Sequence, residues 1–292
     1  MNKFLERLQS GETLVADGST GASLHKMGLQ PGILPEDLII DQPEMVLRLE
    51  SAFVAAGSDI ILTCTFGGTR LRMKESKYAD RVVEINTRAA ELARQAASAR
   101  NGVLVAGSIG PTGLLMKPYG PLTADEATAT FTEQAKALAE GGVDLLVIET
   151  MFAFEEADAA FKGACSVTDL PIVVSFSYDR GVRTMMGVKP ADMFKRYEEM
   201  GAVMIGANCG TTLENMEKIQ QEYAVTEPGF PLWAKPNAGL PRLADGVTTF
   251  DVTPQQMAEY AKKYIALGAR VVGGCCGNMP EHIAAIVKAV KQ

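Results

Sequence analysis

The sequence has 292 residues, of which 47% are hydrophobic and 22% charged, the balance of an ordinary globular protein and not of a disordered chain or a mini-protein. Its formal net charge of −7, without a block of Lys and Arg, argues against nucleic acid or an anionic membrane surface as a partner. No apolar run approaches the roughly 18–20 residues of a membrane span, and the N-terminus carries charges where a signal peptide needs an apolar segment. We therefore expect a cytoplasmic protein with no membrane partner.

Short apolar, β-branched segments ending in Gly, Asp, Asn or Cys recur along the chain, which is typical of strands buried on both faces of a parallel sheet. Segments of helical periodicity separate them, and several begin with a capping box, as at Thr123–Glu126 and Thr253–Gln256. The expected strands cover residues 13–18, 59–66, 103–110, 143–150, 171–178, 202–210, 231–239 and 269–277.

This alternation predicts an α/β protein with a (β/α)8 TIM barrel, because eight equal strand–helix units close naturally on themselves. A doubly wound open sheet is the competing arrangement. The sequence contains no linker rich in Pro or Ser and no change of composition, so we expect a single domain over residues 1–292. In such a barrel the chemistry lies at the carboxyl ends of the strands.

The five cysteines are too few and too unevenly spaced for a secreted disulfide framework. Cys209, Cys275 and Cys276 end the sixth and eighth expected strands, where their thiols can share one layer of the barrel. Consecutive strand residues normally point to opposite faces, but the glycines around the Cys275–Cys276 pair let the backbone bend so that both thiols face one ion. Three thiolates without a fourth cysteine predict a zinc site with one position open to substrate.

Other interpretations of these residues stay open. The three cysteines can instead pack as small apolar groups, or the neighbouring pair can form a strained vicinal disulfide. We expect Cys165, on a helix, to pack in the core, and Cys64 to lie closer to the barrel mouth. His25 and His282 are expected to be a solvated loop residue and a helix-start residue, neither of them catalytic.

An open zinc tris-thiolate predicts a reaction class. Zinc coordination deprotonates an incoming thiol at neutral pH and so creates a nucleophile. The surplus negative charge on the sulfur ligands favours attack on an electrophilic carbon over hydrolysis. Alkyl transfer to sulfur is the expected chemistry.

At these residues the chain resembles the homocysteine S-methyltransferase family, and the likeness spans essentially the whole sequence. The matching motifs are ADGSTG (16–21), TCTFGGT (63–69), GSIGPTG (107–113), IET (148–150), GANCG (206–210), PNAGLP (236–241) and GGCCG (273–277). Within the family, KPNAGLP and the end of the chain are most similar to the homocysteine-binding module of cobalamin-dependent methionine synthase. The resemblance implies Zn²⁺ on Cys209, Cys275 and Cys276, and homocysteine as the methyl acceptor.

The remaining polar groups fit an amino-acid substrate. The turn after the first expected strand offers backbone N–H groups at Gly18 and Ser19 for a carboxylate, and Glu149 offers its carboxylate to an ammonium group. The resemblance places the family's amino-acid contacts at these positions. Asp17 either assists with the ammonium group or caps the turn.

Two asparagines complete the candidate substrate-binding residues. Asn208 and Asn237 either hydrogen-bond the substrate or brace loops, and Asn237 is also a candidate for the open zinc position when no substrate is bound.

The methyl donor is not fixed by the sequence. Only residues 277–292 follow Cys276, so we expect no folate, cobalamin or reactivation module, and a methylcorrinoid would come on a separate protein or as free methylcobalamin. Stand-alone family members instead use S-methylmethionine, S-adenosylmethionine or betaine. We favour a separate corrinoid protein because of the PNAGLP motif. Methyl transfer to another thiol or selenol, and a zinc-storing or zinc-sensing barrel without enzymatic activity, stay open.

Overall fold

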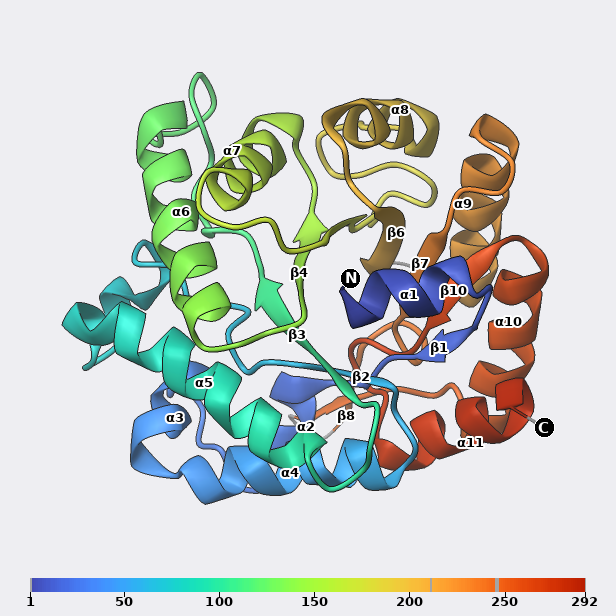
Figure 1. Cartoon of the computed structure of the whole chain (residues 1–292), viewed down its shortest axis with the longest axis horizontal. Coiled ribbons are helices and arrows are strands. Elements are labelled where there is room, and N and C mark those ends of the chain that lie inside the picture. Colours follow the sequence, from blue (N-terminus) through green and yellow to red (C-terminus); the bar gives the residue numbers. More distant parts are fainter. Residues whose placement is uncertain (1, 211, 245–246, 292) are drawn as a thin grey trace.

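The computed structural model describes residues 2–210, 212–244 and 247–291. Within them, parallel strands form a barrel surrounded by helices (Figure 1), in the order β1-β10-β7-β6-β5-β4-β3-β2. A parallel bridge between Ala16 and Ile60 joins the first and last strands of that order. The (β/α)8 barrel is therefore confirmed and the open doubly wound sheet is wrong. Its strands are β1 (Leu14–Val15), β2 (Ile60–Leu62), β3 (Leu104–Ile109), β4 (Leu145–Met151), β5 (Ile172–Phe176), β6 (Met204–Cys209), β7 (Leu232–Pro236) and β10 (Ala269–Val272).

Helices cover the outside of the barrel, and the expected capping boxes are present at Thr123–Glu126 and Thr253–Gln256. No helix in these described ranges is both long and apolar enough to cross a bilayer. The helices are α1 (Lys3–Gln9), α2 (Thr20–Lys26), α3 (Leu38–Asp41), α4 (Pro43–Ala55), α5 (Val82–Ala97), α6 (Ala124–Glu140), α7 (Phe154–Cys165), α8 (Pro190–Met200), α9 (Leu213–Thr226), α10 (Pro254–Ala266) and α11 (Pro280–Lys291).

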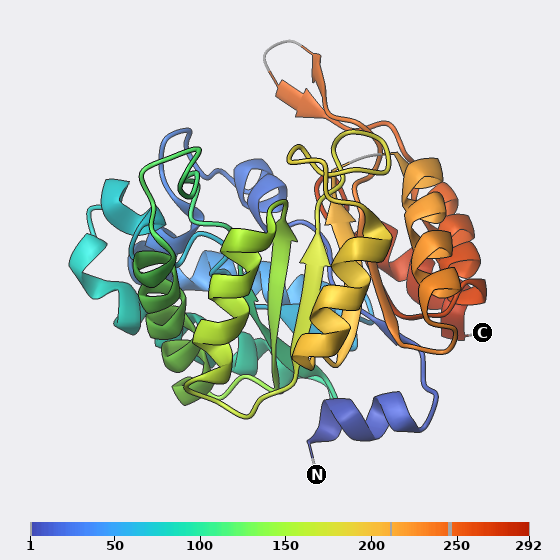
Figure 2. The same ribbon diagram turned by 90° about the horizontal axis from the view of Figure 1, so that it is seen from above.

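The barrel interior is apolar toward the amino ends of the strands and polar toward their carboxyl ends. Alternate residues of each strand face inward, and those in the lower part form one cluster in which Trp233 is the largest side chain. Phe4 of α1 packs into the same cluster and is fully buried. Figure 2 shows α1 lying across this end of the barrel, opposite the end to which the strand arrows point. In the part of the chain that the structure describes, α1 and apolar side chains thus fill the interior at the amino ends of the strands.

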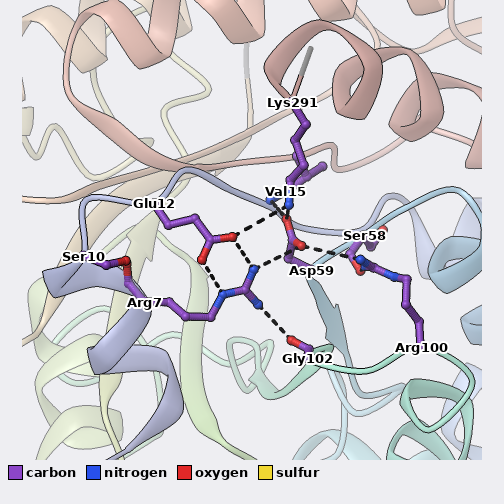
Figure 3. Close-up of polar contacts among 9 residues, drawn as sticks. All are labelled: Arg7, Ser10, Glu12, Val15, Ser58, Asp59, Arg100, Gly102 and Lys291. Carbon is purple, nitrogen blue, oxygen red and sulfur yellow. Dashed lines mark hydrogen bonds and ion pairs between the residues drawn. The ribbon is translucent and has the colours of Figure 1, made fainter.

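Ion pairs reinforce the closed end around Asp59, which is 2% exposed. Its Oδ2 accepts a hydrogen bond from the Val15 N–H at 2.8 Å and lies 2.5 Å from Lys291 Nζ (Figure 3). Arg7 and Arg100 approach its Oδ1 at 3.2 and 3.8 Å. These contacts tie both ends of the chain and the turn before β3 to the β1–β2 seam, where the barrel closes.

An antiparallel hairpin follows β7 and was not expected from the sequence. It consists of β8 (Arg242–Ala244) and β9 (Val247–Thr249). Figure 2 shows it projecting beyond the carboxyl ends of the barrel strands. Each strand has only three residues, too short for a periodic pattern to stand out.

Candidate functional site

The three thiols expected to converge lie together at the barrel mouth. Cys209 ends β6, and Cys275 and Cys276 follow β10. Their sulfur atoms all lie within 4.8 Å of one another, and those of Cys209 and Cys276 are 3.5 Å apart. All three are free cysteines. Over the described ranges, this is the group of His, Cys, Asp and Glu side chains whose spacing would hold a metal ion.

The backbone beneath the thiols is locally unusual, which the glycine pattern predicted for the Cys275–Cys276 pair but not for Cys209. Cys209 has a φ of +58° and Gly210 one of +69°, a left-handed conformation that non-glycine residues rarely adopt outside functional sites. Beyond β10, Gly277 has a φ of +79°, and a Cβ there would lie 2.3 Å from the Phe250 ring. The tight turns that aim the thiols inward therefore require these glycines.

Without a cation the thiols stay protonated. The hydrogen bond with Cys275 lowers the pKa of Cys209, but the contact with Cys276 and burial outweigh it and raise that pKa to about 12. The hydrogen bond with Cys209 lowers the pKa of Cys276, but the contact and charge of Cys275, together with burial, raise it to about 12. Three soft sulfur donors crowded in this way fit Zn²⁺, whose charge would compensate the thiolates.

A cavity of about 370 Å³ lies beside the thiols at the carboxyl ends of the strands. It includes Gly18, Ser19 and Glu149 among the expected substrate-binding residues, and also Cys64, which the sequence placed near the mouth. Asp17, Asn208 and Asn237 lie outside its lining. The full lining consists of Gly18, Ser19, Thr20, Gly21, Ala22, Leu34, Pro35, Glu36, Leu62, Thr63, Cys64, Phe66, Gly67, Arg72, Ser108, Glu149, Thr150, Cys209, Lys235, Cys275 and Cys276.

Glu149 presents a carboxyl group to this cavity from β4. It is 6% exposed, and its Oε1 accepts a hydrogen bond from Ser108 Oγ at 2.6 Å. Burial raises its pKa, an effect that Lys235 and the Ser108 hydroxyl oppose. The group keeps acceptor capacity for a cationic partner, since a carboxylate can accept about four hydrogen bonds.

The turn after β1 is more constrained than the sequence suggested. The Ser19 N–H donates to the Asn278 carbonyl at 2.9 Å, so it is already committed within the protein. Gly18 must be glycine, because a Cβ there would lie 2.3 Å from the same carbonyl oxygen. The N–H groups of Thr20 and Gly21 follow in the first turn of α2, where backbone donors have no intrahelical acceptor, and both residues line the cavity.

The two asparagines brace the mouth. Asn208 Oδ1 accepts from the Thr150 N–H at 2.9 Å and from Ser175 Oγ at 2.6 Å, which holds Thr150 at a φ of +61°. Asn237 Oδ1 accepts from the Cys276 N–H at 3.0 Å. Bracing is thus the role that their contacts support, and a direct contact with substrate stays a prediction.

Lys235 is a site residue that the sequence analysis missed. It is 2% exposed, lines the cavity, and places its Nζ 2.6 Å from Asp17 Oδ1. Asp17 Oδ2 also accepts from the Leu62 N–H at 2.7 Å, so its carboxylate is engaged on both oxygens. The available signal was a lysine inside the otherwise apolar segment PLWAKP, since a charged residue is rarely buried without a partner.

The expectations for Cys165 and the two histidines are confirmed only in part. Cys165 is exposed, so its expected packing in the core is wrong. His25 is exposed but lies on α2 instead of a loop. His282 lies in the first turn of α11, as expected, where its Nδ1 accepts from the Met279 N–H at 3.2 Å. Neither histidine lines the cavity.

A family model described as homocysteine S-methyltransferase matches residues 14–290. The chain belongs to this family. Membership supports a methyltransferase activity directed at homocysteine, and it agrees with the thiol cluster and the adjoining cavity described above.

Solved structures confirm the fold. The metallated form of the homocysteine methyltransferase MmuM from Escherichia coli matches with a TM-score of 0.82 and 24% identity, over 98% of this chain and 99% of that one. Its oxidized form matches with a TM-score of 0.82 and 24% identity, over 99% of each chain. A methyltransferase from Methanosarcina mazei matches with a TM-score of 0.62 and 12% identity, over 99% of this chain and 97% of that one.

Proposed function

We propose that this protein is a zinc-dependent homocysteine S-methyltransferase that produces methionine. The observation that carries the proposal is the placement of three convergent thiols on the wall of a cavity that also contains a buried carboxyl group. One end of this site suits a metal-assisted thiol and the other suits the ammonium group of an amino acid. Family membership and the metallated form of MmuM support the same assignment.

Two groups of the cavity lining hold the α-carbon end of the acceptor. Glu149 takes the ammonium group, because a buried carboxylate gains most from a cationic partner. The turn after β1 takes the carboxylate, at Gly18 and Ser19, which both line the cavity. Because the Ser19 N–H already donates to the Asn278 carbonyl, the contact expected there falls to the Gly18 N–H. With the ammonium and carboxylate groups on the α-carbon both held, the side chain of homocysteine extends toward the cysteines.

Zn²⁺ held by Cys209, Cys275 and Cys276 would supply the charge that keeps a fourth sulfur deprotonated at neutral pH. The cavity walls of Leu34, Leu62 and Phe66 limit the water around that sulfur. In the transfer, a sulfur lone pair forms the bond to the methyl carbon while the bond from carbon to the donor breaks. The electron pair of that bond leaves with the donor.

For the donor, we favour a methylcorrinoid on a separate protein, supported by the KPNAGLP motif at the end of β7. S-methylmethionine, S-adenosylmethionine and betaine are the alternatives. The deciding assay supplies homocysteine with methylcobalamin or each alternative donor and measures methionine. Methyl transfer from none of them contradicts the proposed function, and competition with other thiols or selenols tests the acceptor.

Calorimetry separates the enzyme from a zinc-storing barrel. A storage protein has no use for an amino-acid pocket, whereas the enzyme binds homocysteine through Glu149. We expect homocysteine binding in the wild type that is lost in Glu149→Ala, with zinc content unchanged in both. Absence of homocysteine binding in the zinc-loaded wild type contradicts the enzyme.

A further inference from the structure

Lys235 has no role in the proposed chemistry and yet occupies a costly position. It points into the barrel directly above Trp233, with its Nζ 5.9 Å from the centroid of that ring. Its partner on the adjacent strand β6 is Asn208. Burial alone lowers the pKa of Lys235, but the charges of Asp17 and Glu149 outweigh burial and the net pKa is raised. The lysine is therefore charged inside the protein.

The Asp17–Lys235 pair spans a strand. Asp17 follows β1 and Lys235 lies in β7, and these are the two strands that flank β10 in the sheet. β10 leads directly into Gly273–Cys276, the turn that carries two of the three thiols. The ion pair therefore links β1 to β7, the two strands on either side of β10 and the turn that follows it.

Main-chain hydrogen bonds attach the turn to both sides. On one side, the Gly274 N–H donates to the Asp17 carbonyl at 3.0 Å. On the other, the Cys275 N–H donates to the Pro236 carbonyl at 2.8 Å, next to Lys235. The fit is tight, since a Cβ on Gly273 would lie 2.9 Å from the Ala16 carbonyl oxygen.

We infer that Asp17 and Lys235 form a clamp across β10 that holds the Cys275–Cys276 turn in the geometry needed for metal binding. Lys235 is then a positioning residue. Stability is a weak reason for such a pair, because replacing a buried ion pair by neutral groups of similar volume often leaves a protein as stable or more so. The inference rests on the proposed metal site for its consequence, but the clamp itself is a property of the metal-free chain.

The test compares Lys235→Met with Lys291→Met. Both substitutions remove a lysine that pairs with a 2%-exposed aspartate, Asp17 at the mouth and Asp59 at the closed end. Zinc affinity is measured on each purified protein by competition with a chelator. We expect Lys235→Met to bind zinc roughly 10–100-fold more weakly, the usual cost of losing support behind metal ligands. Lys291→Met should bind zinc as the wild type does.

A second readout needs no metal. Amide hydrogen exchange at Gly274 and Cys275 in metal-free protein reports the two bonds that attach the turn. We expect both amides to exchange at least tenfold faster in Lys235→Met and at the wild-type rate in Lys291→Met. If the wild type binds no zinc, the proposed function fails, while exchange still decides the clamp.

A lone buried aspartate can prevent Lys235→Met from folding. The double variant Asp17→Asn/Lys235→Met removes both charges, keeps an acceptor for the Leu62 N–H, and still lacks the clamp. We expect it to fold and to show the same losses. Wild-type zinc affinity or wild-type exchange at the turn, in either folded variant, overturns the inference.

Discussion

The β1–β2 seam carries an aspartate–lysine pair at each end, and the two pairs serve different ends of the barrel. Both aspartates are 2% exposed and accept a main-chain hydrogen bond from the opposite strand, Asp59 from Val15 and Asp17 from Leu62. Among the described residues, one parallel bridge, between Ala16 and Ile60, joins the two strands across this seam. The carboxylates of Asp59 and Asp17 thus add hydrogen bonds across a seam where the strands pair over a short length.

The surroundings of the two pairs differ. Three cations converge on Asp59, and the cluster sits over a packed apolar interior. At the mouth, Lys235 is shared between Asp17 and the charge of Glu149, beside an open cavity. The closed end thus satisfies its charge internally, whereas the mouth keeps carboxyl and thiol groups available for a ligand. The β1–β2 seam therefore helps to close the barrel at its amino end and to shape the candidate site at its carboxyl end.

The largest expected effect comes from the thiols. Cys209→Ser and Cys276→Ser should each lose bound zinc and reduce methyl transfer to background, because a serine hydroxyl is a poor ligand for zinc. Metal analysis of the purified variants checks this. Cys165→Ser, at an exposed position on α7, is the matched control and should keep both. Full zinc retention in the two site variants would remove the basis of the metal centre.

The next effect concerns the acceptor pocket. Glu149→Gln keeps the shape of the side chain but removes its charge. We expect the Kd for homocysteine to rise by about 100-fold, or about 2.7 kcal/mol, the size of a charge-assisted hydrogen bond. Calorimetry measures the Kd, and zinc content should not change. A Kd within twofold of wild type would place the ammonium group elsewhere.

The closed end should affect stability alone. Asp59→Asn keeps an acceptor for the Val15 N–H but removes the charge that the surrounding cations share, so the free energy of unfolding should fall by about 2 kcal/mol. Chemical denaturation measures this. Zinc and homocysteine affinities of the folded variant should match wild type. A loss of zinc affinity as large as that of Lys235→Met would show that the two ends are not independent.

The smallest effect is a shift in pH dependence. Burial raises the pKa of Glu149, and the ionised form binds the ammonium group, so homocysteine affinity is full above that raised pKa and falls as the pH drops through it. The Ser108 hydroxyl opposes the rise. Ser108→Ala should therefore move the acid limb to higher pH, with a similar plateau. If the acid limb of the homocysteine affinity profile does not move, a group other than Glu149 controls it.

The fold was predictable because each buried strand has a continuous apolar run and each unit repeats the same order. The meeting of the thiols was predictable as well, since the glycines that bend the chain are adjacent to Cys275 and Cys276. These signals are local. They depend on neighbouring residues and on the general rule that strand ends meet at one mouth.

The misses are long-range or depend on orientation. Lys235 and Asp17 are 218 positions apart, and only barrel closure brings β7 and β1 to the two sides of β10. Cys165 is the last residue of α7, where the direction of a side chain depends on how the helix ends. Ser19 looked free because its acceptor, the Asn278 carbonyl, lies near the other end of the chain.

Phe4 and the apolar side chains around it fill the barrel at the amino ends of the strands, and this has a kinetic consequence. The cavity is reached from the carboxyl ends of the strands, so a molecule bound nearer the entrance blocks access to the thiols behind it. For the proposed reaction we therefore expect homocysteine, bound against the thiols, to enter before the donor, and methionine to leave after the spent donor. Initial-rate measurements with both substrates varied should show a compulsory order, with the donor unable to bind productively first.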